Sequence, residues 1–224
     1  MMAEIIFLLS LSIVFPLLVG ILRRKIVLPA YGPLLLLFCL GLVAELSTRY
    51  AVSTEKFNWI PANNVYILLE SLLIPTQFFV WGYMRRGRTL LKLIAVCFLL
   101  SWIAEHLIWG DIYHLHPYFR MFYSLVIVLL GINAINFLVI HEEKNLLSHP
   151  VFIACTAFII FFTYQLVYEG IYNIVTNLET IDTGKLNTAF SVINFVCNIL
   201  YGIALILVPS KRVKEDWFSD KNSG

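Results

Sequence analysis

Four glutamates lie inside long apolar segments of the chain, where ionisable side chains are costly. These residues are Glu45, Glu70, Glu105 and Glu169. A charge in the middle of a bilayer costs at least a few kcal/mol, so a carboxylate in such a segment is by default a candidate functional residue. A desolvated carboxylate attracts cations and amines, and it can also take up a proton. The sequence therefore points first to cation or proton chemistry.

The four glutamates share a depth. Counted at about 1.5 Å per residue from the ends of their segments, all four lie roughly 5 to 12 Å from the same surface. Glu70 is the deepest, and its own segment contains no basic residue. Glu45 with Arg49, and Gln165 with Glu169, are four residues apart and so share a helix face. We predict one ligand-binding site from these residues and their polar neighbours: Glu70, Glu105, Glu45, Arg49, His106, Arg120, Gln165, Glu169 and Asn194.

Several of these residues also have a structural interpretation that the sequence leaves open. Glu45 and Arg49 suit an ion pair at the membrane surface, with both charged groups extended toward water. Glu169 suits a position on the rim of a helix, and His106 suits a packed core histidine. Asn194 is of a residue type that forms hydrogen bonds between membrane helices. The shared depth is the observation that favours a common site.

The residue inventory gives no positive signal for catalysis. A retinal Schiff base needs a lysine deep in the last segment, which holds none beyond Lys185 at its mouth. Zinc hydrolysis needs three suitable ligands, and the apolar segments contain no His-x-x-x-His or His-Glu-x-x-His pair. A metal site built from Glu45, Glu70, Glu105 and His106 stays open as an alternative. We predict no catalytic residue, no resident metal and no cofactor.

Seven apolar segments must position the candidate residues. A helix that crosses a bilayer needs about 20 mostly apolar residues, and we predict such helices over residues 4–22, 30–50, 65–84, 90–109, 118–140, 150–172 and 186–208. Pro16 and Pro75 predict kinks in the first and third of them. Residues 53–64 predict a polar loop in which Pro61 forms part of a turn or cap. A charged tail of residues 209–224 follows the bundle.

Composition places the chain in the class of integral membrane proteins. Of its 224 residues, 60% are hydrophobic and only 13% are charged, whereas soluble domains carry roughly a quarter charged residues. The mean hydropathy is +0.83. The lipid bilayer is therefore the predicted surroundings of the fold. A net charge of +2 is too small to suggest a nucleic-acid partner.

Basic residues are divided unequally between the two ends of the predicted bundle. Twelve of the 16 lysines and arginines follow the first, third, fifth and seventh segments, while Arg49, Lys56, Arg120 and Lys185 lie toward the other side. Lys and Arg near membrane helices are retained on the cytoplasmic side. We therefore predict an all-α, polytopic seven-transmembrane bundle with its amino terminus outside and its carboxyl terminus in the cytoplasm. The acidic site then faces outward.

The chain resembles a known family in three short runs. They are residues 64–70 (Asn-Val-Tyr-Ile-Leu-Leu-Glu), residues 149–152 (His-Pro-Val-Phe) with the later Tyr164, and residues 193–201 (Ile-Asn-Phe-Val-Cys-Asn-Ile-Leu-Tyr). They are similar to small seven-helix membrane proteins of unknown function that are common in Bacteroidetes and often encoded near sensor histidine kinases. Residues 152–153 are Phe-Ile here, where the family pattern has Phe-Trp. The resemblance implies a multi-pass protein of the bacterial inner membrane with a membrane signalling partner, and it supplies no catalytic residue.

These observations favour a receptor-like or sensory membrane protein that binds a small polar or cationic ligand from the periplasm through Glu70. Acids with few bases nearby prefer a cation or an amine. Two other classes stay open. A small-solute or proton-coupled transporter is expected to show broken helices, paired repeats and a path through both halves of the bundle. A membrane-embedded lipid-modifying enzyme is expected to turn over lipid.

Overall fold

The computed structural model describes residues 7–54, 58–84, 87–141, 146–178 and 183–209, and all regular structure within these ranges is helical. The α-helices there are α2 (Val14–Leu22), α3 (Arg24–Thr54), α4 (Ile60–Val80), α5 (Gly87–Ile103), α6 (Pro117–His141), α7 (Pro150–Leu178) and α8 (Thr183–Leu207). Two 3₁₀ turns, η1 (Leu11–Ile13) and η3 (Leu146–Ser148), precede α2 and α7, and a π-helical turn, η2 (Ala104–Ile108), extends α5. Among the described helices, five are long and apolar enough to cross a membrane, namely α3, α5 with η2, α6, α7 and α8. This is the pattern of a multi-pass membrane protein, and the predicted all-α class is confirmed for the described residues.

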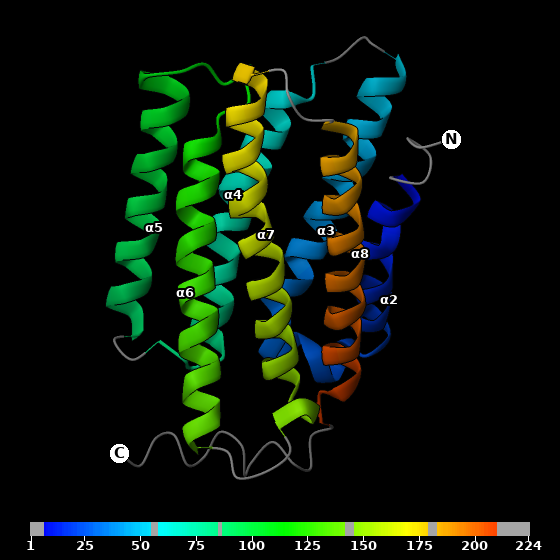
Figure 1. Cartoon of the computed structure of the whole chain (residues 1–224). Helices are drawn as coiled ribbons and strands as arrows, with labels where there is room; N and C mark the ends of the chain where they lie inside the picture. The colour runs from blue at the N-terminus through cyan, green and yellow to red at the C-terminus, as the bar shows by residue number, and fades with distance from the viewer. Residues whose placement is uncertain (1–6, 55–57, 85–86, 142–145, 179–182, 210–224) are drawn as a thin grey trace.

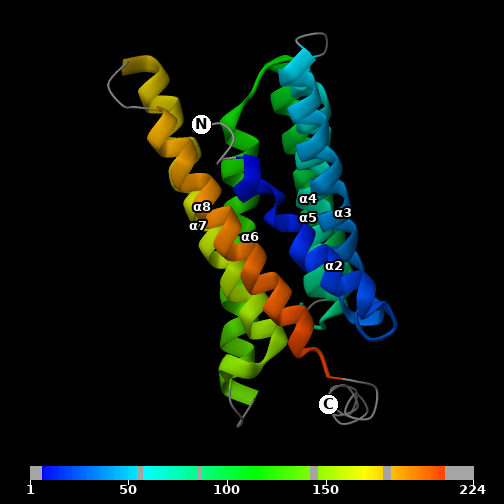
Figure 2. The same cartoon turned by 90° about the vertical axis from the view of Figure 1, so that its right-hand side faces the viewer.

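The helices run up and down beside one another (Figures 1 and 2). In the described part, the ring order of neighbours is α2, α3, α4, α6, α7 and α8, with α8 packed back against α2. The remaining helix, α5, lies outside this ring against α4 and α6. Arg23, Arg24 and Arg88 lie where α2 ends and where α3 and α5 begin, so we call this the basic end of the bundle. The loop from η2 to α6 lies at the opposite end (Figure 1).

Helix boundaries agree best with the prediction where turn residues flank an apolar run. The predicted helix over residues 118–140 is α6, and the one over 186–208 is α8. The third predicted helix, over residues 65–84, differs from α4 at both ends. The helix α4 begins at Ile60 and ends at Val80. Pro61 lies in its first turn, a position that suits proline. Just before the helix, the side-chain Oδ1 of Asn58 accepts the Ile60 N–H over 3.0 Å. The predicted start of the first helix at residue 4 and most of the charged tail lie outside the described residues.

The helix α3 is broken at Tyr31. Its φ of −129° and ψ of 20° are not helical, and it lies between Pro29 and Pro33. Pro33 has no N–H and its ring crowds the carbonyl of Pro29, so a regular helix cannot pass through this point. By contrast, α4 is one continuous helix through Pro75. Ahead of Pro16, the chain tightens into the 3₁₀ turn η1.

The Gln77 side chain of α4 forms hydrogen bonds with the backbone on both sides of the break in α3. Its Nε2 donates to the carbonyl oxygen of Ala30 over 2.7 Å, and its Oε1 accepts the N–H of Leu34 over 3.0 Å. These two backbone groups would bond each other in an intact helix. Gln77 is fully buried. The side chain of one helix thus satisfies both backbone groups exposed by the break in another.

Replacing Gln77 with methionine is expected to lower the free energy of unfolding by about 2–6 kcal/mol. Methionine has a similar length but leaves the Ala30 carbonyl and the Leu34 N–H buried without partners, and each of these two unsatisfied groups costs about 1–3 kcal/mol. Thermal unfolding of the purified protein in detergent measures the change. The control is Thr76→Val, because the Thr76 hydroxyl donates to the Leu72 carbonyl oxygen of its own helix. Equal melting temperatures for the two variants would contradict this role of Gln77.

Aromatic rings and Arg23 fill the half of the bundle nearer the basic end. Trp81 packs edge-on against Tyr31 and Phe78, with ring centroids 5.3 and 5.6 Å apart, and Phe158 lies 5.6 Å from Phe78. The Arg23 guanidinium donates to three carbonyl oxygens at the end of α8, those of Leu205, Ile206 and Val208. These carbonyls have no partner within their own helix. One basic residue of this end therefore caps a helix.

Candidate functional site

The helix ring lines a partly open cavity of about 230 Å³ in the half of the bundle away from the basic end. Its lining runs from Thr48 and Asn63, near the ends of α3 and α4, down to Ile74 and Tyr201. Each helix of the ring except α2 contributes side chains, and the segment that leads into α2 contributes Ser10 and Ile13. Five of the nine candidate residues line this one space: Glu45, Glu70, Arg120, Gln165 and Asn194. Residues from five helices therefore meet at the predicted depth.

Glu70 forms the centre of a hydrogen-bonded chain across one wall of the cavity. The Tyr123 hydroxyl of α6 donates to its Oε2 over 2.8 Å, and the Tyr66 hydroxyl, one turn earlier in α4, donates to its Oε1 over 3.3 Å. Gln165 Nε2 of α7 donates in turn to the Tyr123 oxygen over 2.9 Å. Glu70 is only 9% exposed. Because these donors are neutral hydroxyls, they orient the carboxylate without neutralising its charge.

Arg120 and Glu169 form an ion pair one turn above this chain. Arg120 Nη1 of α6 lies 2.8 Å from Glu169 Oε1 of α7, and both side chains are largely buried. They follow the same helix faces as Tyr123 and Gln165, which are three and four residues away. Arg120 lines the cavity, and Glu169 lies behind it. The positive charge of the cavity wall is thus matched by a carboxylate outside the lining.

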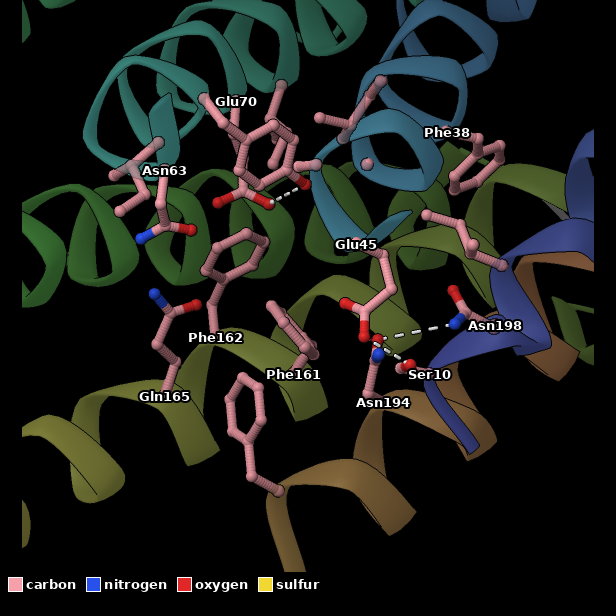
Figure 3. A pocket seen from close by; sticks show the side chains of 18 of the residues that line it. Ser10, Phe38, Glu45, Asn63, Glu70, Phe161, Phe162, Gln165, Asn194 and Asn198 are labelled. Carbon is pink, nitrogen blue, oxygen red and sulfur yellow. Dashed lines mark hydrogen bonds between the residues drawn. The ribbon is translucent and has the colours of Figure 1, made fainter. Parts of the chain in front are cut away.

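Glu45 reaches the cavity from α3 on the other side. Its Oε1 accepts the Ser10 hydroxyl over 2.5 Å. Nearby in α8, Asn198 Nδ2 donates to the Ser12 hydroxyl over 2.8 Å and lies 3.4 Å from Asn194 Oδ1. In the view of Figure 3, Glu45 lies with Ser10 and Asn194, Glu70 lies with Asn63 and Gln165, and the rings of Phe161 and Phe162 stand between the two groups. The cavity therefore has two acidic ends.

Arg49 lies one turn beyond Glu45 and does not belong to the described lining of the cavity. Its guanidinium carbon stands 4.8 Å from the centroid of the Phe7 ring, a cation–π distance. Arg49 therefore packs against the first described turn of the chain. This contact gives Arg49 a packing role, which differs from the predicted ion pair with Glu45 and from a place in the cavity lining.

Glu105 caps the start of α6 and does not line the cavity. Its two carboxylate oxygens accept the backbone N–H groups of Tyr118 and Phe119 over 2.9 and 2.5 Å. These are unpaired donors of the first helical turn, and a carboxylate there is favoured by the helix dipole. The π-helical turn η2 carries Glu105 to this position. Its depth matches the prediction, but its side chain serves a different helix.

His106 likewise belongs to the packing outside the cavity. Its ring stacks on Trp102 with centroids 5.0 Å apart, and its Nδ1 lies 3.1 Å from the Trp102 carbonyl oxygen. Trp102 in turn donates from Nε1 to the carbonyl of Asn64, whose Nδ2 bonds the carbonyls of Ile112 and His114. These contacts anchor the loop between η2 and α6. Glu105 and His106 are therefore not included in the site that we propose below.

Aromatic side chains make up much of the remaining wall. They come from five helices and are Phe38, Tyr66, Tyr123, Phe158, Phe161, Phe162, Phe190 and Tyr201. The sequence reasoning missed these residues, because an aromatic residue in a membrane helix can face lipid, protein or a cavity, and its type does not distinguish the three. Tyr66 was also missed, although its spacing of four from Glu70 places both residues on one helix face and could have identified it. Aromatic faces carry negative potential and attract cations.

The described residues include no group of three His, Cys, Asp or Glu side chains placed to hold a metal ion. The alternative metal site from Glu45, Glu70, Glu105 and His106 is therefore not assembled, because the last two point to α6 and its preceding loop. The cavity offers two carboxylates, the Arg120 guanidinium that is paired with Glu169, several neutral hydroxyl and amide groups, and aromatic faces. This set suits a small organic cation.

The chain was compared with protein-family models, with curated proteins and with solved structures, and none of the three comparisons found a match. The resemblance drawn from the three short sequence runs stays a prediction.

Proposed function

We propose that the chain is a seven-span membrane protein whose amino terminus faces outward. The apolar helical stretch Phe7–Leu22, which ends with α2, and the helix α4 join the five apolar spans in this arrangement. The 21-residue length of α4 is sufficient for a bilayer, and its polar residues Glu70 and Gln77 are directed into protein contacts. The helices alternate in direction, so the basic end lies on one side of the membrane. By the positive-inside rule, that side is the cytoplasm.

Fusion of a reporter to the carboxyl terminus tests this topology. Green fluorescent protein at that position is expected to fluoresce, and alkaline phosphatase there is expected to be inactive, because each folds on only one side of the inner membrane. Alkaline phosphatase inserted after Tyr113, in the loop between η2 and α6, is the matched control and should be active. The opposite pattern of activities would contradict the proposed orientation.

For the function, we infer a receptor-like or sensory protein that binds a small organic cation from the periplasmic side. The observation that carries this proposal is the convergence of Glu45 and Glu70 on one aromatic cavity. Arg120 adds a positive charge, but Glu169 balances it at 2.8 Å. The cavity and the carboxylate directly behind it therefore keep an excess of negative charge. A desolvated cation also gains about 2 kcal/mol or more from an aromatic face.

The size of the cavity limits the ligand. Its volume of about 230 Å³ is below the roughly 300–1,000 Å³ of pockets that enclose drug-sized molecules. A compact ammonium group fits this space and can contact carboxylates and rings together. A primary amine could also donate hydrogen bonds to Gln165 or Asn194.

The packing toward the basic end favours reception over transport. Phe158 and Tyr201 line the cavity and also pack against each other, with ring centroids 5.2 Å apart. Phe78 and Trp81 lie beyond them, in the aromatic cluster that fills this half. A cation that enters from outside therefore meets packed rings, whereas a transporter needs a path through both halves. The family resemblance adds the expectation of a signalling partner in the inner membrane.

Titration with tetramethylammonium tests the proposal, because this ion has a permanent charge and no hydrogen-bond donor. The protein in lipid nanodiscs is expected to bind it saturably in isothermal titration calorimetry, and tetramethylphosphonium should compete. Neopentyl alcohol (2,2-dimethylpropanol), an uncharged molecule with a tert-butyl group of similar size, serves as control and should bind far more weakly. Equal binding of the charged and uncharged compounds would contradict a cation site. Accumulation of the ion in proteoliposomes would favour a transporter, and turnover of lipid would favour an enzyme.

A further inference from the structure

A second hollow lies on the seam between α3 and α4. It is a groove of about 170 Å³, and its walls are mainly apolar side chains with small residues between them. Three of its apolar residues are well exposed, with exposed fractions of 61% for Val43, 44% for Val65 and 39% for Leu69. In a membrane-spanning bundle, surfaces of this kind face lipid tails. The groove is therefore open to the hydrocarbon region.

The groove and the acidic cavity share a wall. Ala44, Thr48, Asn63 and Tyr66 line both spaces. The two cavity carboxylates adjoin the same wall along the chain, since Glu45 follows Ala44 in α3 and Glu70 is one turn from Tyr66 in α4. A molecule that occupies both spaces would thus have its charged group at the carboxylates and its apolar part in lipid.

Tyr66 forms much of the partition between the two spaces. Its hydroxyl reaches across to α3, where a Cβ added to Gly41 would lie only 3.3 Å from it. The same hydroxyl holds Glu70 through a hydrogen bond of 3.3 Å, which is long and therefore weak. Beside it, the amide nitrogen of Asn63 is buried and has no hydrogen-bond partner among the described residues. The shared wall thus consists of small side chains, the weakly hydrogen-bonded Tyr66 ring, and the Asn63 amide nitrogen, which has no hydrogen-bond partner among the described residues.

We propose that the cavity ligand is an amphiphilic ammonium compound with a single hydrocarbon chain, which lies in the α3–α4 groove while the ammonium group binds between Glu70 and Glu45. This inference rests on the proposed function. The continuity of an apolar, lipid-facing groove with an acidic cavity matches the two parts of such a molecule. The chain passes the partition by displacing the Tyr66 ring, whose one hydrogen bond to Glu70 is replaced by the ligand charge. A single narrow groove on this seam suits one chain.

A series of alkyltrimethylammonium ions from methyl to octyl tests the proposal in detergent-solubilised protein. The measured quantity is the ratio of octyl to methyl affinity in wild type and in variants that fill the groove, Ser47→Trp and Ala62→Trp. The control is Leu129→Trp, at a lipid-facing position of α6 with an exposed fraction of 57%. Partitioning of the octyl chain into micelles is the same for all four proteins, so it cancels from the comparison.

Wild type and Leu129→Trp are expected to share a ratio at least tenfold above that of both groove-filling variants, because each buried methylene is worth about fourfold in affinity. The affinity for tetramethylammonium should stay unchanged in all four, which also shows that the variants fold. The same ratio in all four proteins would overturn the groove while leaving the cation site in place. Failure of wild type to bind tetramethylammonium would overturn the proposed function and this inference with it.

Discussion

Replacement of Glu70 with glutamine is expected to lower the affinity for tetramethylammonium at least thirtyfold while the protein remains folded. Glutamine has nearly the same shape and keeps an oxygen that can accept the Tyr123 hydroxyl, now 2.8 Å from the carboxylate. It lacks the negative charge. Removing one partner of a buried charge pair costs about 2–5 kcal/mol, and about 1.4 kcal/mol corresponds to a tenfold change. Isothermal titration calorimetry in nanodiscs measures the effect.

The matched control for this variant is Glu105→Gln. Both carboxylates lie in apolar helices at a similar depth, and both are largely buried, at 9% and 8% exposed. Only Glu70 lines the cavity. Glu105→Gln is therefore expected to bind tetramethylammonium with the affinity of wild type. If the two substitutions weakened binding equally, the assignment of the site to the cavity would be wrong.

Replacement of Glu105 with alanine is expected to lower the free energy of unfolding by about 2–4 kcal/mol. The carboxylate accepts two backbone N–H groups at the start of α6, and that of Phe119 is buried. A buried donor left without a partner costs about 1–3 kcal/mol, and loss of a helix cap costs about 1 kcal/mol more. Thermal unfolding in detergent, followed by circular dichroism, measures the loss.

Asp111→Ala is the comparison for that experiment. Asp111 Oδ1 also accepts a backbone N–H, that of Tyr113, over 3.0 Å, but this contact is exposed to solvent. Water can replace the carboxylate there, so the expected change is below about 1 kcal/mol. A loss of stability in Asp111→Ala as large as that in Glu105→Ala would show that the whole loop, and not the cap, sets the stability of α6.

Much of the helical frame could be predicted because apolar runs of about 20 residues have few alternatives. The prediction for α6 differs from the structure by one residue at each end, and Pro117 explains its start. The prediction for α3 was less accurate, because the basic cluster of residues 23–25 indicated a loop between the first helix and a second helix that begins at residue 30. The helix instead begins at Arg24 and continues past the break at Tyr31. It does so with the help of Gln77, which comes from another helix and is not visible in local sequence.

The depth of the candidate residues in the bundle could be predicted from the sequence, but the direction in which each side chain points was harder to predict. Spacing along each helix placed Glu45, Glu70 and Gln165 at one level, and the structure brings them to one cavity. Glu105 lies at the same level, but the π-helical turn directs it to the start of α6. A change from an α-helix to a π-helix alters which face a residue occupies. The spacing of residues in the sequence does not predict such a change. Buried polar residues nearer the basic end, such as Gln77 and His149, were also missed.

The central claim is that a small cation binds between Glu70 and Glu45 inside the helix ring. The most direct test is a crystal structure of the wild-type protein soaked with tetramethylarsonium, in which arsenic replaces nitrogen and scatters anomalously. The account predicts an anomalous peak in the cavity, in contact with the Phe161 and Phe162 rings and between the two carboxylates. A peak at the membrane surface only, with the cavity free of arsenic at saturating concentration, would contradict it.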